Sequence, residues 1–285
     1  MAFSIDPAVK KAFFEDGTVK IPKFLDADML AQAQALFDWS LANPGPSGAP
    51  FRDGENVYRG DLFNPEAMDV YRETVAALPL AKLLKEMWDS EHVWYGHEEL
   101  FYKKGHAPAT HWHQDAPTYI PILGDHFAGC WICFDACPAG YAIDVVRGSH
   151  RGIVWDGNDL EDPTQPFWGE HANLPPLPDI EASTVLWEVQ RADPNSWDVV
   201  SYAVEPGDVV LLHPGCLHRG GPVDETCRER RTLILRFFGD DAKWGELPGS
   251  RDVLSDFHKK YVMPASVGQE KVGAAFRGER YPQLF

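Results

Sequence analysis

Hydrophobic residues recur three and four positions apart over much of the first 90 residues, which is typical of amphipathic helices. Asp6-Pro7 and Asp26 stand where helix caps are expected, directly before two of these periodic stretches. The predicted elements are a helix over 6–14, a turn over 15–18, a strand over 19–21, a helix over 26–42, a Pro- and Gly-rich loop over 43–56 and a helical stretch over 65–88 that breaks near Pro79. The N-terminal part is therefore predicted to be mostly helical.

The pattern changes from residue 92 onward to short runs of β-branched and aromatic residues, separated by clusters of Gly, Pro and Asp. Eight strands are predicted, over 92–95, 100–102, 127–134, 142–146, 185–189, 199–204, 209–212 and 232–238. No helix-length periodic segment lies between them, so they lack the crossover helices of a parallel sheet. The pattern favours an antiparallel barrel or jelly roll. The loop over 152–181 is long enough to act as a lid.

The charge balance restricts the partners of this chain. The 285 residues carry 26 Lys and Arg against 43 Asp and Glu, a formal charge of −17. This balance argues against nucleic acid and against an anionic membrane surface as partners. No apolar stretch approaches the ~18 residues of a membrane span, and the first residues lack the layout of a signal peptide. Five cysteines suit a reducing compartment, so we expect a cytoplasmic protein.

The strongest chemical signal lies in two histidine-containing segments about a hundred residues apart, at positions 111–115 and 213–218. In an extended segment His113 and Asp115 lie on one face, and a distant histidine, either His213 or His218, can join them. Two histidines and one carboxylate hold Fe(II) and leave coordination positions open for a chelating co-substrate and O2. The sequence His111-x-His113-x-Asp115 also resembles the zinc motif of metallo-β-lactamases, although Ala116 stands where a further histidine is required.

A second signal is the arginine-rich start of the predicted strand that follows these histidines. Arg230 and Thr232 lie two residues apart, so a strand directs both to one side and Arg231 to the other. A guanidinium on the inner side is suited to the far carboxylate of a dicarboxylate such as 2-oxoglutarate. The alternative is an edge strand with solvated arginines.

These segments, together with Phe14-Glu15-Asp16-Gly17, Trp131-Ile132-Cys133-Phe134-Asp135 and Arg147-Gly148-Ser149-His150, resemble the phytanoyl-CoA dioxygenase family of Fe(II)/2-oxoglutarate-dependent oxygenases. The resemblance covers most of the chain. It implies a mainly β fold, a double-stranded β-helix (a cupin-like jelly roll) with N-terminal helices packed outside. The expected organisation is one domain over 1–285, with a mostly helical part over 1–90, the jelly-roll core over 91–240 and a tail over 241–285.

The resemblance also implies roles for individual residues. His113, Asp115 and His218 match the metal ligands, and Arg230 matches the anchor of 2-oxoglutarate. The positions that line the co-substrate pocket are matched by Trp131, Gln114 and Lys103, with Lys104 as the alternative to Lys103. Two positions depart from the family pattern. Gly220 replaces a serine, which removes one hydrogen bond to the co-substrate, and Arg147 replaces a proline.

The expected activity is that of a dioxygenase that uses Fe(II), 2-oxoglutarate and O2, with ascorbate as a stimulant. It hydroxylates, or otherwise oxidises, an unactivated C–H bond of a small organic substrate and releases succinate and CO2. The Asp115 carboxylate favours hydroxylation or desaturation over halogenation. A metallo-hydrolase and a non-catalytic cupin-type binding protein are the alternatives.

The negative charge favours a small molecule, a carboxylic acid or a secondary metabolite, over an acyl-CoA. Candidate substrate-binding residues are the aromatic Trp94, Tyr119, Trp168 and Trp187 and the basic Arg59 and Arg147.

Overall fold

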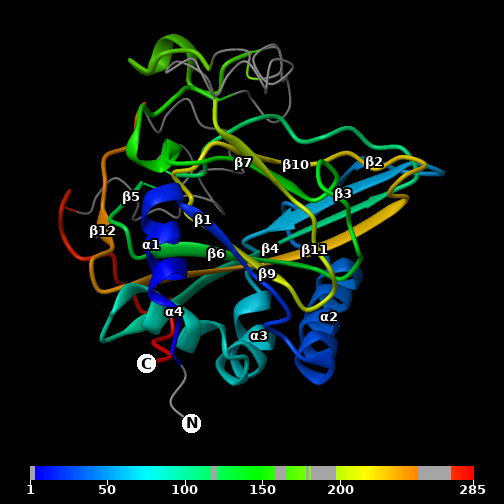
Figure 1. Ribbon diagram of the computed structural model, residues 1–285. Coiled ribbons are helices and arrows are strands. Elements are labelled where there is room, and N and C mark those ends of the chain that lie inside the picture. Colours follow the sequence, from blue (N-terminus) through cyan, green and yellow to red (C-terminus); the bar gives the residue numbers. More distant parts are fainter. Residues whose placement is uncertain (1–3, 117–120, 158–164, 178–179, 181–196, 250–270) are drawn as a thin grey trace.

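Two antiparallel sheets enclose an apolar interior, and helices cover the outer face of the larger sheet (Figure 1). The structure is a computed structural model that describes residues 4–116, 121–157, 165–177, 180, 197–249 and 271–285. This architecture confirms the prediction of a mainly β jelly roll with helices packed outside.

The larger sheet has seven strands in the order β1-β9-β6-β11-β4-β3-β2. Their bounds are β1 Thr18–Ile21, β2 Ala49–Arg52, β3 Val57–Leu62, β4 Val93–Lys104, β6 Phe127–Cys133, β9 Val209–Leu212 and β11 Glu229–Gly239. The smaller sheet, in the order β10-β7-β8, consists of β7 Ile143–Val146, β8 Val199–Tyr202 and β10 His218–Gly220. A separate pair joins β5 Ile122–Leu123 to β12 Lys243–Trp244. Short 3₁₀ turns occupy Ser149–Arg151 and Gly169–His171.

Four helices are present in the described part of the chain: α1 Pro7–Asp16, α2 Ala27–Ala42, α3 Ala67–Ala77 and α4 Leu80–Trp88. The carboxylates of Asp6 and Asp26 accept hydrogen bonds from the first-turn amides of α1 and α2, and such a cap contributes ~1 kcal/mol to helix stability. Gly17 ends α1 at φ 74°, a left-handed conformation that favours glycine. Helices α2, α3 and α4 lie under the sheet in Figure 1, and their apolar residues form one core with its outer face.

Strand β11 runs through the middle of the larger sheet and pairs with β4 on one side and β6 on the other. Its odd-numbered residues from Leu233 to Phe237 pack against the helices. Its even-numbered residues from Arg230 to Arg236 are buried on the opposite face, toward the smaller sheet. The central strand therefore carries two arginines into the interior.

The strands differ from the prediction in several places. The segments expected over 92–95 and 100–102 are one continuous strand, β4, and its pairing with β11 shifts register once between Arg236 and Phe237. The first 90 residues contribute β1 and the hairpin β2–β3 to the larger sheet, so they are less helical than expected. The predicted strand over 185–189 and part of the predicted lid lie outside the described residues.

The end of the chain packs on the β-sheets. The amide of Leu284 donates to the carbonyl of Val93 at the start of β4, and Phe276 packs against Trp244. No helix in the described residues is both long and apolar enough to cross a membrane. All five cysteines are buried and free, and Cys130 and Cys133 face opposite sides of β6.

Candidate metal centre

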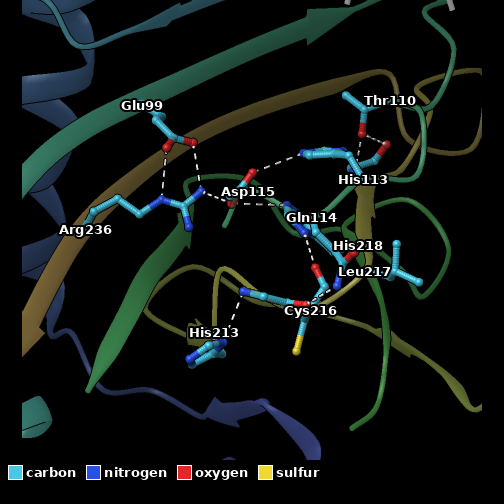
Figure 2. A network of polar contacts seen from close by, with 12 residues as sticks. Glu99, Thr110, His113, Gln114, Asp115, His213, Cys216, Leu217, His218 and Arg236 are labelled. Carbon is cyan, nitrogen blue, oxygen red and sulfur yellow. Dashed lines mark hydrogen bonds and ion pairs between the residues drawn. The ribbon is translucent and has the colours of Figure 1, made fainter. Parts of the chain in front are cut away.

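His113, Asp115 and His218 converge at the start of β10 (Figure 2). The backbones of His113 and His218 are paired by two hydrogen bonds of 3.1 and 2.9 Å, which place the segment 111–115 alongside β10. Nε2 of His113 lies 3.4 Å from Oδ1 of Asp115, and Nε2 of His218 lies 3.7 Å from Oδ2. The three donor atoms lie within 4.8 Å of one another, the one such group of three or more among the described residues.

Both imidazoles have the hydrogen-bond partners that metal-binding histidines need. Nδ1 of His113 lies 2.8 Å from the carbonyl of His111, and Nδ1 of His218 lies 3.0 Å from the carbonyl of Cys216. Because a carbonyl can only accept, each Nδ1 carries the hydrogen, and Nε2 of the neutral ring is left with its lone pair. The lone pairs of the two Nε2 atoms therefore lie next to the carboxylate of Asp115, and a cation can bind to all three groups.

The carboxylate of Asp115 is also paired with an arginine that the sequence analysis did not single out. Nη2 of Arg236 lies 2.5 Å from Oδ2 of Asp115 (Figure 2). Arg236 also makes a two-point contact with Glu99, Nε to Oε1 at 2.9 Å and Nη2 to Oε2 at 3.1 Å. Nε2 of His97 lies 3.1 Å from Oε1 of Glu99. A buried chain of four polar residues thus ends at the candidate metal ligand.

Electrostatics keep this carboxylate ionised in spite of its burial. Burial by itself raises the pKa of Asp115, but the positive charge of Arg236, followed by the interaction with His218, holds that pKa well below its ordinary value. Burial lowers the pKa of His218 to about 4. In His113, burial opposes the charged form, but the hydrogen bond and charge of Asp115 raise its pKa. The site therefore favours a positive charge next to Asp115, and a proton and a metal ion compete for it.

A second polar group lies further into the interior, around Arg230. Nη1 of Arg230 donates to the carbonyls of Tyr141 and Ala142, and the side chain is 2% exposed. Its Nη2 faces Gly220, since a Cβ atom built on that glycine would lie 3.1 Å from Nη2. The same point lies 3.5 Å from Oγ1 of Thr110, which accepts a hydrogen bond from the amide of Gly220. The missing side chain at Gly220 thus lets the guanidinium of Arg230 and the hydroxyl of Thr110 approach the backbone of β10 closely.

Lys103 pairs with Arg230 in the sheet and is fully buried. Its ammonium nitrogen donates to the carbonyls of Pro108 and Gly221 and lies 4.4 Å from the ring centroid of Tyr58. Burial, and next the charges of Arg230 and Arg219, lower the pKa of Lys103 to about 6. Two buried basic groups side by side form a site suited to an anion.

Two of the predicted co-substrate residues have other partners. Thr232 lies on the same inner face as Arg230, but its hydroxyl donates to the carbonyl of Phe101. The amide of Gln114 is buried and bound to backbone, with Nε2 donating to Gly215 and Oε1 accepting from Trp155. Gln114 therefore fixes the segment between His113 and Asp115, and it is not directed into the pocket. Trp131 is buried in the interior between the sheets.

Other candidates lie away from the site. His213 accepts from the amide of Gly215, and its Nε2 lies 3.2 Å from the carbonyl of Gly124, so it is not in the three-residue group. His111, which a zinc hydrolase requires, is exposed and also outside that group.

The proposed substrate-binding side chains also have structural partners. Trp94 stacks on Phe238, and Trp168 is buried in the same aromatic cluster. Arg59 and Arg147 form ion pairs with Asp53 and Asp198, and their role toward an anionic substrate stays a prediction. Tyr119 and Trp187 lie outside the described residues.

Comparisons with known proteins agree with this geometry. The sequence profile of the phytanoyl-CoA dioxygenase family (PhyH) matches residues 13–232. Among curated proteins, none matches the sequence. Several solved structures share the fold at low sequence identity.

One similar structure is the non-heme alpha-ketoglutarate-dependent epimerase SnoN from nogalamycin biosynthesis, with 18% identity, a TM-score of 0.65 and coverage of 98% of this chain and 97% of that one. The carbocyclase SnoK from the same biosynthesis has 17% identity, a TM-score of 0.62 and coverage of 99% and 97%. EctD from S. alaskensis, solved with 2-oxoglutarate and 5-hydroxyectoine, has 18% identity, a TM-score of 0.61 and coverage of 92% and 86%.

Proposed function

Since the chain belongs to the phytanoyl-CoA dioxygenase family of Fe(II)- and 2-oxoglutarate-dependent oxygenases, we propose that His113, Asp115 and His218 hold its iron. Bound Fe(II) supplies the activation of O2, coupled to conversion of 2-oxoglutarate into succinate and CO2 and to oxidation of a C–H bond of the substrate. The donor set supports the assignment, because two imidazole nitrogens and one carboxylate oxygen suit Fe(II). The hydrogen bonds at both Nδ1 atoms leave Nε2 as the metal-binding atom of each ring.

The observation that carries this assignment is the spacing along β10 between His218, a candidate metal ligand, and Gly220, where Arg230 approaches the strand. His218 and Gly220 lie two residues apart on one strand, which corresponds to ~6.7 Å along β10. The keto-acid end of 2-oxoglutarate would bind beside His218, and its far carboxylate would bind to the guanidinium of Arg230, which approaches β10 at Gly220. The hydroxyl of Thr110 lies close to the same glycine, and Lys103 pairs with Arg230 on the neighbouring strand. Such charge-assisted hydrogen bonds are roughly twice as strong as neutral ones.

The residues of the chain have distinct tasks in this proposal. Arg230 and Lys103 attract the dicarboxylate, and Trp131 forms an apolar wall that excludes water. Gln114 fixes the backbone between two metal ligands through its bonds to Gly215 and Trp155. We assign the whole chain to one domain, since β1–β3 from its first part complete the sheet that carries β4 and β11.

The substrate class proposed is a small organic molecule such as a secondary metabolite. SnoN and SnoK are enzymes of nogalamycin biosynthesis, and EctD was solved with 5-hydroxyectoine. The formal charge of −17 disfavours an acyl-CoA, which carries several negative charges itself. Five free buried thiols support a reducing, cytoplasmic location.

The test is spectroscopic and chemical. Purified protein receives Fe(II) and then 2-oxoglutarate without oxygen, and chelation of the iron by the keto acid is expected to give a visible absorption band. Air and a panel of small-molecule substrates are then added with ascorbate, and succinate is measured. A correct substrate increases succinate and yields an oxidised product. If the protein forms neither the absorption band nor succinate, the assignment is wrong. That result would favour the alternative of a non-catalytic binding protein.

A further inference from the structure

The buried chain His97–Glu99–Arg236–Asp115 has no role in holding the co-substrate as proposed above. Arg236 and His97 are 3% and 4% exposed, and the side chain of Glu99 is 13% exposed. Charged groups in such positions are costly unless each one is paired. His97 is hydrogen-bonded to Glu99, and Glu99 is paired with Arg236. Arg236 is paired in turn with Asp115, a candidate metal ligand, and Figure 2 shows the part from Glu99 to Asp115.

We propose that Arg236, held in place by Glu99, is a positioning residue that restricts Asp115 to one metal-binding oxygen. This inference rests on the proposed iron site. Oδ2 of Asp115, which lies 3.7 Å from Nε2 of His218, accepts a hydrogen bond from the guanidinium at 2.5 Å. Oδ1 lies 3.4 Å from Nε2 of His113 and is the oxygen that the guanidinium leaves available. A carboxylate bound through both oxygens takes an additional coordination position. By keeping Oδ2, Arg236 leaves that position for the co-substrate or O2.

The orientation of Arg236 is fixed on several sides. Glu99 contacts it through two parallel hydrogen bonds, a geometry that the planar guanidinium forms and an ammonium does not. Gly129, the residue paired with Arg236 on β6, leaves room for it, because a Cβ atom there would lie 3.2 Å from Nη1. Attraction to Arg236, against the opposing effect of burial, holds the pKa of Glu99 at about 2. Contacts with Glu99 and Asp115 therefore hold the guanidinium through Nε and Nη2.

The chain offers a matched control on the same strand. Arg231 makes a two-point contact with Asp135, with Nε and Nη2 at 3.2 and 2.8 Å from the carboxylate oxygens. It lies on the other side of β11, away from the metal site. If arginine–carboxylate pairs on β11 serve stability alone, the two arginines should be equivalent in metal binding. The proposal expects them to differ.

The experiment compares the wild type with R236K, E99Q and the control R231K. Affinity for Mn(II) is measured by titration without 2-oxoglutarate, and the absorption band of the Fe(II)–2-oxoglutarate complex is recorded without oxygen. R236K and E99Q are expected to bind Mn(II) 10–100-fold more weakly, the loss typical of residues that support metal ligands, and to shift the band. R231K should match the wild type within about twofold in affinity and keep its band.

Folded R236K and E99Q proteins with wild-type affinity and an unchanged band would overturn the proposal, and so would an equal loss in R231K. If R236K does not fold, E99Q decides, because glutamine keeps the shape of Glu99 and removes only its charge. Failure of the proposed function is a separate result: the wild type itself would then bind no metal and form no band with 2-oxoglutarate, and this inference would fall with it.

Discussion

Arg230 and Gly220 lie on different strands of the two sheets, and Nη2 of Arg230 would lie 3.1 Å from a Cβ atom on Gly220. The absence of a side chain at position 220 therefore lets the guanidinium approach the strand that carries His218. The hydroxyl of Thr110 lies close to the same position. The serine expected at position 220 from the family pattern is absent, and a hydroxyl from another segment lies beside that position.

Replacement of Arg230 by Met should raise the KM for 2-oxoglutarate by at least about tenfold, because loss of one partner of a buried charge pair costs ~2–5 kcal/mol. The measurement is succinate release at varied 2-oxoglutarate. The matched control is R231M, whose side chain pairs with Asp135 on the opposite face. An R230M enzyme with unchanged KM, or an R231M enzyme with the larger effect, would show that another arginine is the anchor.

Thr110→Val should raise the same KM by about tenfold, since a hydrogen bond to a charged group contributes ~1.5–3 kcal/mol. Valine has the shape of threonine but lacks the hydroxyl. Thr110→Ser keeps the hydroxyl and serves as the control, with KM expected close to the wild-type value. Equal KM values for the serine and valine variants would remove Thr110 from the co-substrate site.

Binding of 2-oxoglutarate to the iron-loaded protein without oxygen should take up about one proton at pH 7 through Lys103. Burial lowers the pKa of this lysine to about 6, so it is mostly neutral before binding. The carboxylate favours the charged form and raises that pKa, and the affinity for 2-oxoglutarate should therefore fall as the pH rises above 6. Calorimetry in two buffers with different ionisation enthalpies measures the uptake.

Lys103→Met should lose this proton uptake, whereas Lys104→Met should retain it, because Lys104 is exposed and Lys103 is buried. Uptake that persists in Lys103→Met would assign the proton to a different group.

His113→Ala and His218→Ala should each lose most of the iron bound by the wild type, because two ligands rarely retain an ion that three hold. Metal analysis of the purified proteins gives iron per chain. His213→Asn is the control, since His213 lies outside the three-residue group. Normal iron in His218→Ala together with loss in His213→Asn would reverse the assignment of the distal ligand.

Glu98→Gln should stabilise the protein increasingly as the pH rises from 5 to 8. Burial, partly opposed by the amide of Asn64, raises the pKa of Glu98 from 4.5 to about 8. The folded protein therefore keeps a proton that the unfolded chain releases above pH 4.5, and the free energy of unfolding falls across this range. Glutamine has no proton to lose.

The difference in unfolding free energy between E98Q and the wild type should therefore grow by more than about 1 kcal/mol between pH 5 and 8. Denaturant unfolding at several pH values measures it. Glu73→Gln, on the exposed side of α3, is the control and should show no such trend. A constant difference for E98Q would mean that Glu98 is ionised in the folded protein.

Local patterns in the sequence predicted the fold well where one side of an element is apolar. Helix α2 begins after Asp26 and ends at Ala42, as its apolar spacing indicates. Strand β4 was predicted as two pieces because His97, Glu98 and Glu99 interrupt its apolar pattern. These polar residues are accommodated by partners from distant segments, Asn64 for Glu98 and Arg236 for Glu99. Tertiary contacts of this kind leave no local signal.

In the candidate site, too, the sequence predicted local spacing but not contacts between distant segments. Spacing in the sequence placed His113 beside Asp115 and put Arg230 on the inner face of its strand. Three further steps of the same alternation lead to Arg236, so the face of that arginine was predictable. Its partner was not, because Asp115 is 121 residues away along the chain. The position of Thr110 next to Gly220 could not be predicted either, because it depends on the pairing of the segment before His113 with β10.

Strand β11 carries both Arg230 and Arg236 and is bonded to a neighbour along each edge. The separation between these two guanidinium-bearing positions is therefore set by one continuous backbone and is independent of any connecting loop. Insertions and deletions in the loops would leave that spacing intact. Loops can therefore be exchanged without a change in the spacing of these two arginines, provided that the segment carrying His113 and Asp115 is left in place.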